Sequence, residues 1–462
     1  MTLKGGLRSP LGTKHAGSHE ESVAAPLQQD PLPVTMPQSL NTAGTPHLAD
    51  ILQPERNSFG LIRLIAALAV VVSHSFHLAG APESAEPLAR LTGYSLGTHA
   101  VHVFFTISGV LIAASLMRSQ SLWAYGRARA LRLLPGLIVC VLVTAVVLGP
   151  LVSDVPWSRY LLDSEVLRYA TLTVGLITAN APLPGVFHHN AVPDIVNLPL
   201  WTLKYETLCY LGLALMGVAG LMRSARLTSL ALAPLMLAWV VLAAFPALLP
   251  VDGAPVSLLR LAFSFGLGTL AYVWRERLPI HWFGVAGAWL LMALALGTRI
   301  EGPVEQIFVA YLAVWAASLP TGWLGSLTRK TDLSYGVYIY DWPIAQALVR
   351  FVPGLSQPLL LMGTLALVLP VAALSWMFIE KPALGWKRRT AGEATQTISK
   401  RVRLALRGKS ELPASDPLPS KAELEPSEPA FPLEGPARER FSRIIGLRAA
   451  AVLSPEPIPA GL

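Results

Sequence analysis

One apolar stretch carries an arginine and a histidine at a spacing that puts both on one side of a helix. Residues 59–80 read FGLIRLIAALAVVVSHSFHLAG, with Arg63 and His74 eleven positions apart. Eleven helical steps return to within about 20° of the starting face and rise roughly 16 Å. Ionisable groups in apolar segments are costly, so each is a candidate functional residue. A snorkelling anchor and a packing histidine are the simpler interpretations, and the shared face argues against both.

The next apolar stretch adds two imidazoles. His99 and His102 in GTHAVHVFFTISGVLIAASL stand at i and i+3 and share a helix face. With His74 and His77 they give four imidazoles near the same end of two adjoining helices. Imidazole is a good zinc ligand, but no carboxylate or thiolate accompanies these four. We therefore predict no metal site.

A basic cluster precedes the third apolar stretch. The segment WAYGRARALRLLPG contains Arg127, Arg129 and Arg132, and the last two share a helical face. Guanidinium groups grip phosphates through paired hydrogen bonds, so the cluster is a candidate phosphate site. Anchoring to lipid headgroups is the alternative.

Two later apolar stretches carry carboxylates. In NLPLWTLKYETLCYLGLAL, Glu206 and Tyr210 lie at i and i+4 on one face, and a salt bridge from Glu206 to Lys204 is the simpler alternative. In DLSYGVYIYDWPIAQALV, Asp341 needs a partner or a proton. Aromatic side chains near Asp341 could line a sugar site or simply pack: Tyr335, Tyr338 and Trp342.

Composition shows which elements must hold these groups. The 462-residue chain is 53% hydrophobic and 14% charged, against about 25% charged residues in soluble domains. Many apolar blocks reach the roughly 20 residues that span a bilayer. Cys140 and Cys209 lie in such blocks and are expected in the core. We predict an all-α membrane protein with about ten transmembrane helices, at roughly 59–79, 97–117, 133–152, 198–219, 228–249, 257–274, 281–298, 304–320, 333–351 and 357–379.

The ends of the chain differ from this core. Residues 1–54 are rich in Pro, Ser, Thr and His without an apolar run, which predicts a disordered cytoplasmic tail. Residues 55–382 form the predicted transmembrane domain, and 383–462 a polar, cytoplasmic C-terminal tail.

Basic residues set the predicted orientation. They gather in alternate loops, which the positive-inside rule assigns to the cytoplasm together with both termini: Arg118, Arg127, Arg129, Arg132, Arg223, Arg226, Arg275, Arg277, Arg329 and Lys330. The net charge of +8 therefore reflects contact with membrane lipids, and we expect no nucleic-acid partner. The longest outer segment, about 153–197, is expected to shape a substrate site.

Six short motifs in order resemble those of acyltransferase family 3, the membrane-bound O-acyltransferases of bacterial surface polysaccharides. The resemblance runs from about Arg56 to Pro382. The motifs are Arg63 with His74, AVHVFFTISG, Arg129 with Arg132 and Pro135, WTLKYETLCY, SYGVY, and Glu380-Lys381-Pro382. Two positions depart from the family pattern: His102 replaces a frequent acid, and Asp341 replaces a frequent His or Ala.

The resemblance implies a multi-pass enzyme of the bacterial inner membrane. It implies acyl-coenzyme A, usually acetyl-CoA, as cytoplasmic donor, with no permanently bound cofactor, and a glycan or lipid-linked oligosaccharide as acceptor. His74 would be general base or transient acyl carrier, since imidazole titrates near neutral pH. Arg63 would guide pantetheine or polarise the thioester, and Glu206 would orient an imidazole. The other candidates are Arg127, Arg129 and Arg132 for the donor, and Trp201, Tyr210, Tyr335, Asp341 and His102 for the substrate.

Two other classes of protein remain open. A transporter could use buried Arg, His and Asp to move protons or solute, although neither an internal repeat nor matching Gly/Pro-broken helices stand out. A non-catalytic component of a polysaccharide export complex is the other. Neither alternative predicts acyl transfer that depends on His74.

Overall fold

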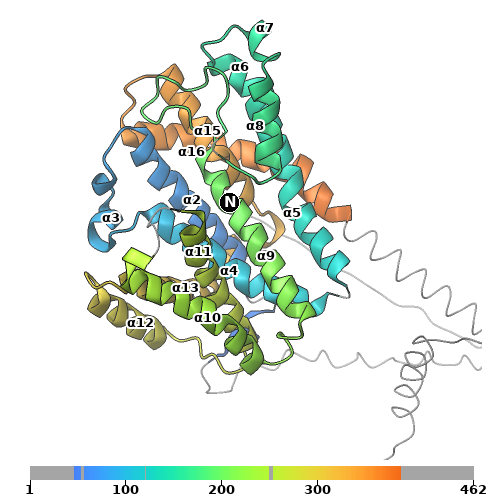
Figure 1. The fold of residues 1–462 in the computed structure, drawn as a ribbon, viewed down its shortest axis with the longest axis vertical. Helices are drawn as coiled ribbons and strands as arrows, with labels where there is room; N and C mark the ends of the chain where they lie inside the picture. The colour runs from blue at the N-terminus through green and yellow to red at the C-terminus, as the bar shows by residue number, and fades with distance from the viewer. Residues whose placement is uncertain (1–45, 54–56, 120, 180, 249–252, 387–462) are drawn as a thin grey trace, which may run out of the picture. The chain divides into compact units, whose positions relative to one another are not determined.

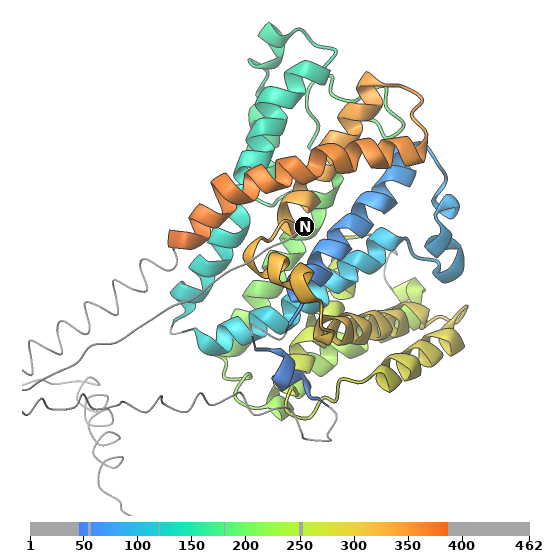
Figure 2. The same cartoon turned by 180° about the vertical axis from the view of Figure 1, so that it is seen from behind.

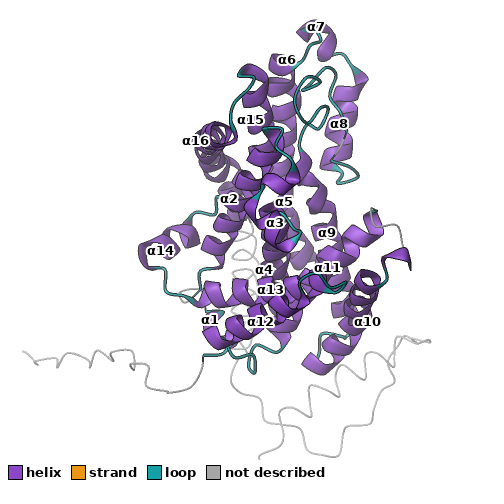
Figure 3. Ribbon diagram, turned by 90° about the vertical axis from the view of Figure 1, so that its left-hand side faces the viewer, coloured by secondary structure: helices purple, strands orange, loops and turns teal. Residues whose placement is uncertain are grey.

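The computed structural model describes residues 46–53, 57–119, 121–179, 181–248 and 253–386 (Figure 1). Every regular element in these residues is a helix (Figure 3), which confirms the predicted all-α class. The predicted tails, apart from their inner ends at 46–53 and 383–386, lie outside the described residues.

Ten long helices follow one another in the described part of the chain. Each overlaps one of the predicted apolar spans. They are α2 (Phe59–Leu78), α4 (Leu96–Arg118), α5 (Leu122–Val143), α9 (Trp201–Val218), α10 (Ala225–Ala244), α11 (Ala254–Val273), α12 (Trp282–Ala295), α13 (Glu301–Ser318), α15 (Ser334–Phe351) and α16 (Gln357–Ser375).

Shorter helices connect or extend these ten. They are α1 (Leu48–Ile51), α3 (Pro87–Thr92), α6 (Gly149–Val152), α7 (Trp157–Tyr160), α8 (Ser164–Val174) and α14 (Gly322–Lys330). Single π-helical stretches lengthen α5 and α16, at Thr144–Leu148 and Trp376–Glu380.

Six of the helical segments are long and apolar enough to cross a membrane. They are Phe59–Leu78, Leu96–Arg118, Leu122–Val152, Ala225–Ala244, Ala254–Val273 and Gln357–Trp386. A seventh would be α13 with α14, which are bent by 102° at their junction. The protein is therefore a membrane protein, while the count of ten crossings stays a prediction. The helices α9 and α15, outside these six, carry the charged residues Lys204, Glu206 and Asp341.

Small residues bring α4 and α11 into close contact. A Cβ atom on Gly109 would lie 2.1 Å from the carbonyl oxygen of Phe265, and one on Gly268 would lie 2.0 Å from that of Thr106. The two backbones therefore touch directly, because neither glycine carries a side chain that would hold them apart. On its other side α4 packs along α2, and α2 packs in turn against α15 and α16 (Figure 2).

The segment that connects α5 to α9 forms a lobe of α6, α7 and α8 beside α5 and α15 (Figure 3). Its last part is tied to α15: Trp342 Nε1 donates to the carbonyl of Ile195 at 3.0 Å, and Gln346 Nε2 donates to that of Val192 at 2.8 Å. Three residues in this segment have positive φ angles without being glycine: Leu176 at 58°, and Phe187 and Asp194 at 62° each. Such strained positions persist where the surroundings impose them.

Residues 46–53, at the inner end of the predicted tail, are folded. The helix α1 buries Leu48 and Ile51, and the amide of Leu48 donates to the carbonyl of Leu278 at 3.1 Å. The packed part of the chain therefore begins before the predicted boundary at residue 55.

Candidate active site

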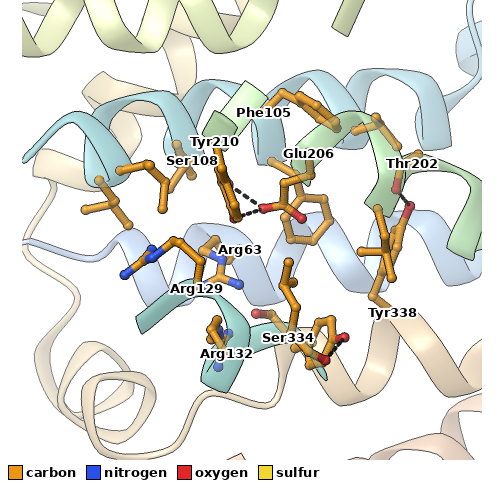
Figure 4. Close-up of a pocket in the computed structure, with 18 residues that line it drawn as sticks. Arg63, Phe105, Ser108, Arg129, Arg132, Thr202, Glu206, Tyr210, Ser334 and Tyr338 are labelled. Atoms are coloured by element: carbon orange, nitrogen blue, oxygen red, sulfur yellow. Dashed lines mark hydrogen bonds between the residues drawn. The ribbon is translucent and has the colours of Figure 1, made fainter. Parts of the chain in front are cut away.

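An arginine-lined cavity of about 90 Å³ lies between α2, α4, α5, α9 and α15 (Figure 4). We call it the arginine pocket. Its polar and charged lining comprises Arg63, Ser108, Arg129, Arg132, Thr202, Glu206, Tyr210, Ser334, Tyr335 and Tyr338. The pocket thus collects candidates from four of the six sequence motifs.

Asp332 holds two of the arginines in place. Its Oδ2 atom lies 3.0 Å from Nη1 of Arg63 and 2.5 Å from Nη2 of Arg132. Burial alone would raise the pKa of Asp332, but Arg132 and Arg63 outweigh it and hold this pKa well below its usual range. Arg132 also approaches Glu380 at 3.7 Å. These two arginines are therefore already paired with protein carboxylates.

Arg129 has a different environment. Its guanidinium donates a long hydrogen bond, 3.4 Å, to Ser115 and lies 6.0 Å from the ring centroid of Tyr210. Its Nε atom is buried without a hydrogen-bond partner in the described residues. Its helix neighbour Arg127 lies outside the lining of the arginine pocket. Arg129 thus offers unused donors to an anion.

Glu206 stands in the same pocket. Its carboxylate accepts hydrogen bonds from Ser108 at 3.1 Å and from Tyr210, so the predicted i, i+4 pair forms (Figure 4). Lys204, its alternative partner, instead lies 4.8 Å from the ring centroid of Tyr205. The imidazole of His74 takes a different carboxylate as its partner.

A second, larger cavity of about 270 Å³ contains His74, and we call it the histidine pocket. His74 Nδ1 lies 2.6 Å from Oδ2 of Asp341, and the imidazole meets the ring of Trp342 edge-on at 4.9 Å. Asp341 is 1% exposed and its other oxygen has no hydrogen-bond partner in the described residues. A buried carboxylate on Nδ1 fixes the imidazole and leaves Nε2 for a proton transfer.

The two pockets adjoin one another. Val101 and Tyr338 line both, and the Tyr338 hydroxyl is held by Thr202 Oγ1 at 2.7 Å and the Pro199 carbonyl at 3.0 Å. Arg63 lines one pocket and His74 the other, so the helix α2 runs past both, as the eleven-residue spacing suggested.

The structure divides the remaining sequence candidates between the pockets. Trp201 and His102 line the histidine pocket. Tyr335 lines the arginine pocket, donates to the Leu133 carbonyl at 2.7 Å and lies beneath Arg132. The four imidazoles do not form one cluster: His74 pairs with Asp341, whereas His99 and His102 contact Glu305 on α13.

Sequence reasoning missed Asp332 and Glu305. Asp332 lies two residues before the Ser-Tyr motif, and Glu305 is an ionisable residue inside a predicted span, the same signal that identified Asp341. Both are recognisable only as partners, once the fold brings α2, α5 and α15 together and sets α13 against α4.

A buried His–Asp pair beside a cavity lined by cations is an arrangement that group-transfer chemistry can use. Comparison with known families specifies the group. A family model described as an acyltransferase domain matches residues 56–380. The chain belongs to acyltransferase family 3, as the motifs indicated, and is a membrane acyltransferase.

Two curated relatives match over most of their length. An "O-acetyl transferase" of Shigella phage Sf6 is 29% identical over 338 residues, 70% of this chain and 95% of the relative. "Nodulation protein 10" of Rhizobium leguminosarum bv. viciae is 29% identical over 374 residues, 73% of this chain and 95% of the relative. No solved structure matches.

Proposed function

We propose that this protein transfers an acyl group, acetyl in the simplest case, from cytoplasmic acyl-CoA to a hydroxyl of a cell-envelope or exported polysaccharide. The observation that carries the proposal is the His74–Asp341 pair in a pocket that adjoins the arginine pocket. A general base and an anion-binding cavity are the two parts that a CoA-dependent O-acyltransferase needs. The relative named O-acetyl transferase supports the same chemistry.

Arg129 is the proposed phosphate contact for the donor. Coenzyme A is a polyanion, and a guanidinium with unused donors binds a phosphate through charge-assisted hydrogen bonds. Arg63 and Arg132 are already paired with Asp332, so they shape the pocket and keep it electropositive without being its strongest anion ligands.

His74 is the proposed base. Its Nε2 takes the proton from the acceptor hydroxyl as the hydroxyl oxygen attacks the thioester carbonyl. The carbon–oxygen bond forms, the carbon–sulfur bond breaks, and the imidazolium returns the proton to the departing CoA thiolate. Asp341 stabilises the imidazolium between these steps. If His74 instead carried the acyl group, the same pair would orient its attack.

The histidine pocket is the proposed acceptor site. Trp201, Tyr338 and Trp342 supply aromatic surface, while Ser73 and Glu86 supply hydroxyl and carboxylate groups. Such a mixed lining suits a sugar, which presents apolar faces and hydroxyl edges. In this proposal the protein lies in the bacterial inner membrane, with its termini and basic loops on the cytoplasmic side. It would then bind acyl-CoA through the arginine pocket and meet the glycan from the opposite side of the membrane.

Membrane vesicles of defined orientation test the proposal. Labelled acetyl-CoA supplied to inverted vesicles should label the polysaccharide fraction, and the same donor outside right-side-out vesicles should not. His74→Ala should lower the transfer by about 10²–10⁴-fold, the usual contribution of general acid–base catalysis. His188→Ala is the matched control, because His188 also pairs with an aspartate, Asp194, but is about half exposed. Transfer at the wild-type rate by the His74 variant would overturn the proposed base.

A further inference from the structure

Three metal-ligating side chains meet in the interface between α4 and α13. His99 and His102 come from α4 and Glu305 from α13, and one ligating atom of each lies within 4.8 Å of the others. His102 Nδ1 is 3.0 Å from Oε2 of Glu305, and His99 Nδ1 contacts Oε1. The three side chains are 11%, 2% and 1% exposed for His99, His102 and Glu305. This is the carboxylate that the sequence did not reveal beside the two histidines.

The hydrogen bonds of Thr92 allow a proton on His99 Nε2. The Thr92 hydroxyl has one hydrogen and lies 3.0 Å from the carbonyl of Leu88 and 3.1 Å from that of Tyr94. When it donates to one of these carbonyls, it accepts from His99 Nε2, 3.0 Å away. Metal-binding histidines have this arrangement, in which the second ring nitrogen donates to a neighbouring oxygen. In this tautomer a neutral His99 directs a bare Nδ1 lone pair at the Glu305 carboxylate, and a cation can join these two acceptors.

His102 presents its Nδ1 atom to Glu305, 3.0 Å from Oε2. Its other ring nitrogen, Nε2, is buried and has no hydrogen-bond partner in the described residues. Nδ1 is therefore the ring atom available to an ion beside Glu305, and Nε2 needs a separate partner. His102 also lines the histidine pocket, so a ligand in that pocket can reach the ring.

We propose that His99, His102 and Glu305 bind a divalent transition-metal ion, zinc by preference. Two imidazoles and one carboxylate are a ligand set that zinc takes with a fourth position left open, whereas calcium and magnesium favour oxygen ligands throughout. The ion replaces the proton between His99 and Glu305 and cross-links α4 to α13. Arg260 lines the histidine pocket as well, and its charge would favour an anion or a hydroxide as the fourth ligand.

This site is separate from the proposed base. His74 already has Asp341 as its partner, so acyl transfer by that pair does not require the ion. The ion would fix the helix that carries Val101 and His102 into the wall of the histidine pocket. Its loss should therefore reduce stability whatever the acceptor is.

Metal analysis of the purified protein tests the proposal. The full chain, purified in detergent without chelator and dialysed against zinc, should hold about one zinc ion per chain by elemental mass spectrometry. Glu305→Gln and His102→Ala should lose it. Glu301→Gln should retain it, since Glu301 lies on the same helix and accepts only a hydrogen bond from the Gly297 amide among the described contacts.

Two measurements on the wild type keep the test decisive if the variants fail to fold. Cobalt dialysed into the protein should give the intense visible absorption of four-coordinate cobalt. A chelator should lower the melting temperature, and zinc should restore it. The proposal is overturned if the wild-type protein binds no more zinc or cobalt than Glu305→Gln does, or if the chelator leaves its melting temperature unchanged. Either result would leave a His–Glu cluster that shares a proton.

Discussion

The arginine pocket and the histidine pocket adjoin each other but handle charge in opposite ways. In the arginine pocket permanent cations converge: Arg63 and Arg132 share Asp332, and Arg129 has donors to spare. At the histidine pocket the proposed reactive group is instead an imidazole, His74, which is paired with Asp341. Fixed charge suits holding a polyanion, and a titratable pair suits moving a proton.

The wall between the pockets explains how both can serve one reaction. Tyr338 lines both cavities and is fixed by two hydrogen bonds, to Thr202 and to the Pro199 carbonyl. Under the proposed function, the acyl-CoA donor and the glycan acceptor would then lie on either side of Tyr338. Changes in one pocket should affect one substrate or one step only, and this separation can be tested.

The largest effect is expected from Asp341→Asn. The amide keeps the shape of the carboxylate but cannot stabilise the imidazolium, so kcat for acyl transfer should fall by about 10²–10⁴-fold. The KM for acyl-CoA should stay close to that of the wild type, because Asp341 lies outside the arginine pocket. Steady-state kinetics in proteoliposomes measure both constants.

Asp194→Asn is the control for this change. Asp194 contacts His188 in an aspartate–histidine pair that is about half exposed. Its replacement should leave kcat unchanged. Equal losses in both variants would mean that Asp341 acts through folding, and the pocket comparison would fail.

The next effect concerns stability and the arginine pocket. Asp332→Asn removes the charge that Arg63 and Arg132 share, and removing one partner of a buried ion pair costs about 3–5 kcal/mol. Because the pKa of Asp332 is lowered in the folded protein, its contribution is complete above about pH 4 and is lost as the pH falls further.

Thermal unfolding in detergent measures this contribution. The melting temperature of the wild type should be well above that of Asp332→Asn. The difference between the two melting temperatures should be constant from pH 6 to pH 8 and should shrink in acid. Asp163→Asn is the matched control, because asparagine caps α8 about as well as aspartate does, and it should leave the melting temperature nearly unchanged. A margin that changes between pH 6 and 8 would contradict the assignment of Asp332 as a permanent anion.

Periodicity and apolar length predicted the elements well. A helix overlaps each of the ten predicted spans, and the eleven-residue spacing correctly put Arg63 and His74 on a single helix that passes both pockets. These features depend on local sequence, since the helical repeat and the cost of charge in an apolar segment both act within one segment.

Partnerships between segments could not be predicted in the same way. The interpretation that Glu206 orients an imidazole came from its place at the end of a span, yet its hydrogen bonds come from Ser108 and Tyr210, and His74 takes Asp341. The latter two are 267 residues apart in the chain. Their contact depends on how α2 and α15 pack, which a single sequence does not encode in any local pattern.

The smallest effect is expected for Arg129, and it tests the division of labour between the pockets most directly. Arg129→Ala should raise the KM for acetyl-CoA by about 10- to 100-fold, the loss of a charged hydrogen bond, with little change in kcat. Lysine should rescue poorly, because a single ammonium cannot reproduce the paired donors of guanidinium. Arg226→Ala is the control, because Arg226 is an exposed arginine at the start of α10, and this variant should behave as the wild type.

The decisive comparison uses S-acetylpantetheine, a donor that keeps the thioester but lacks the phosphates. If Arg129 binds phosphate, the variant and the wild type should use this donor equally well. If the variant instead showed the same increase in KM with both donors, Arg129 would contact the reacting thioester and not the phosphates. The contrast between a binding pocket and a catalytic pocket would then no longer hold.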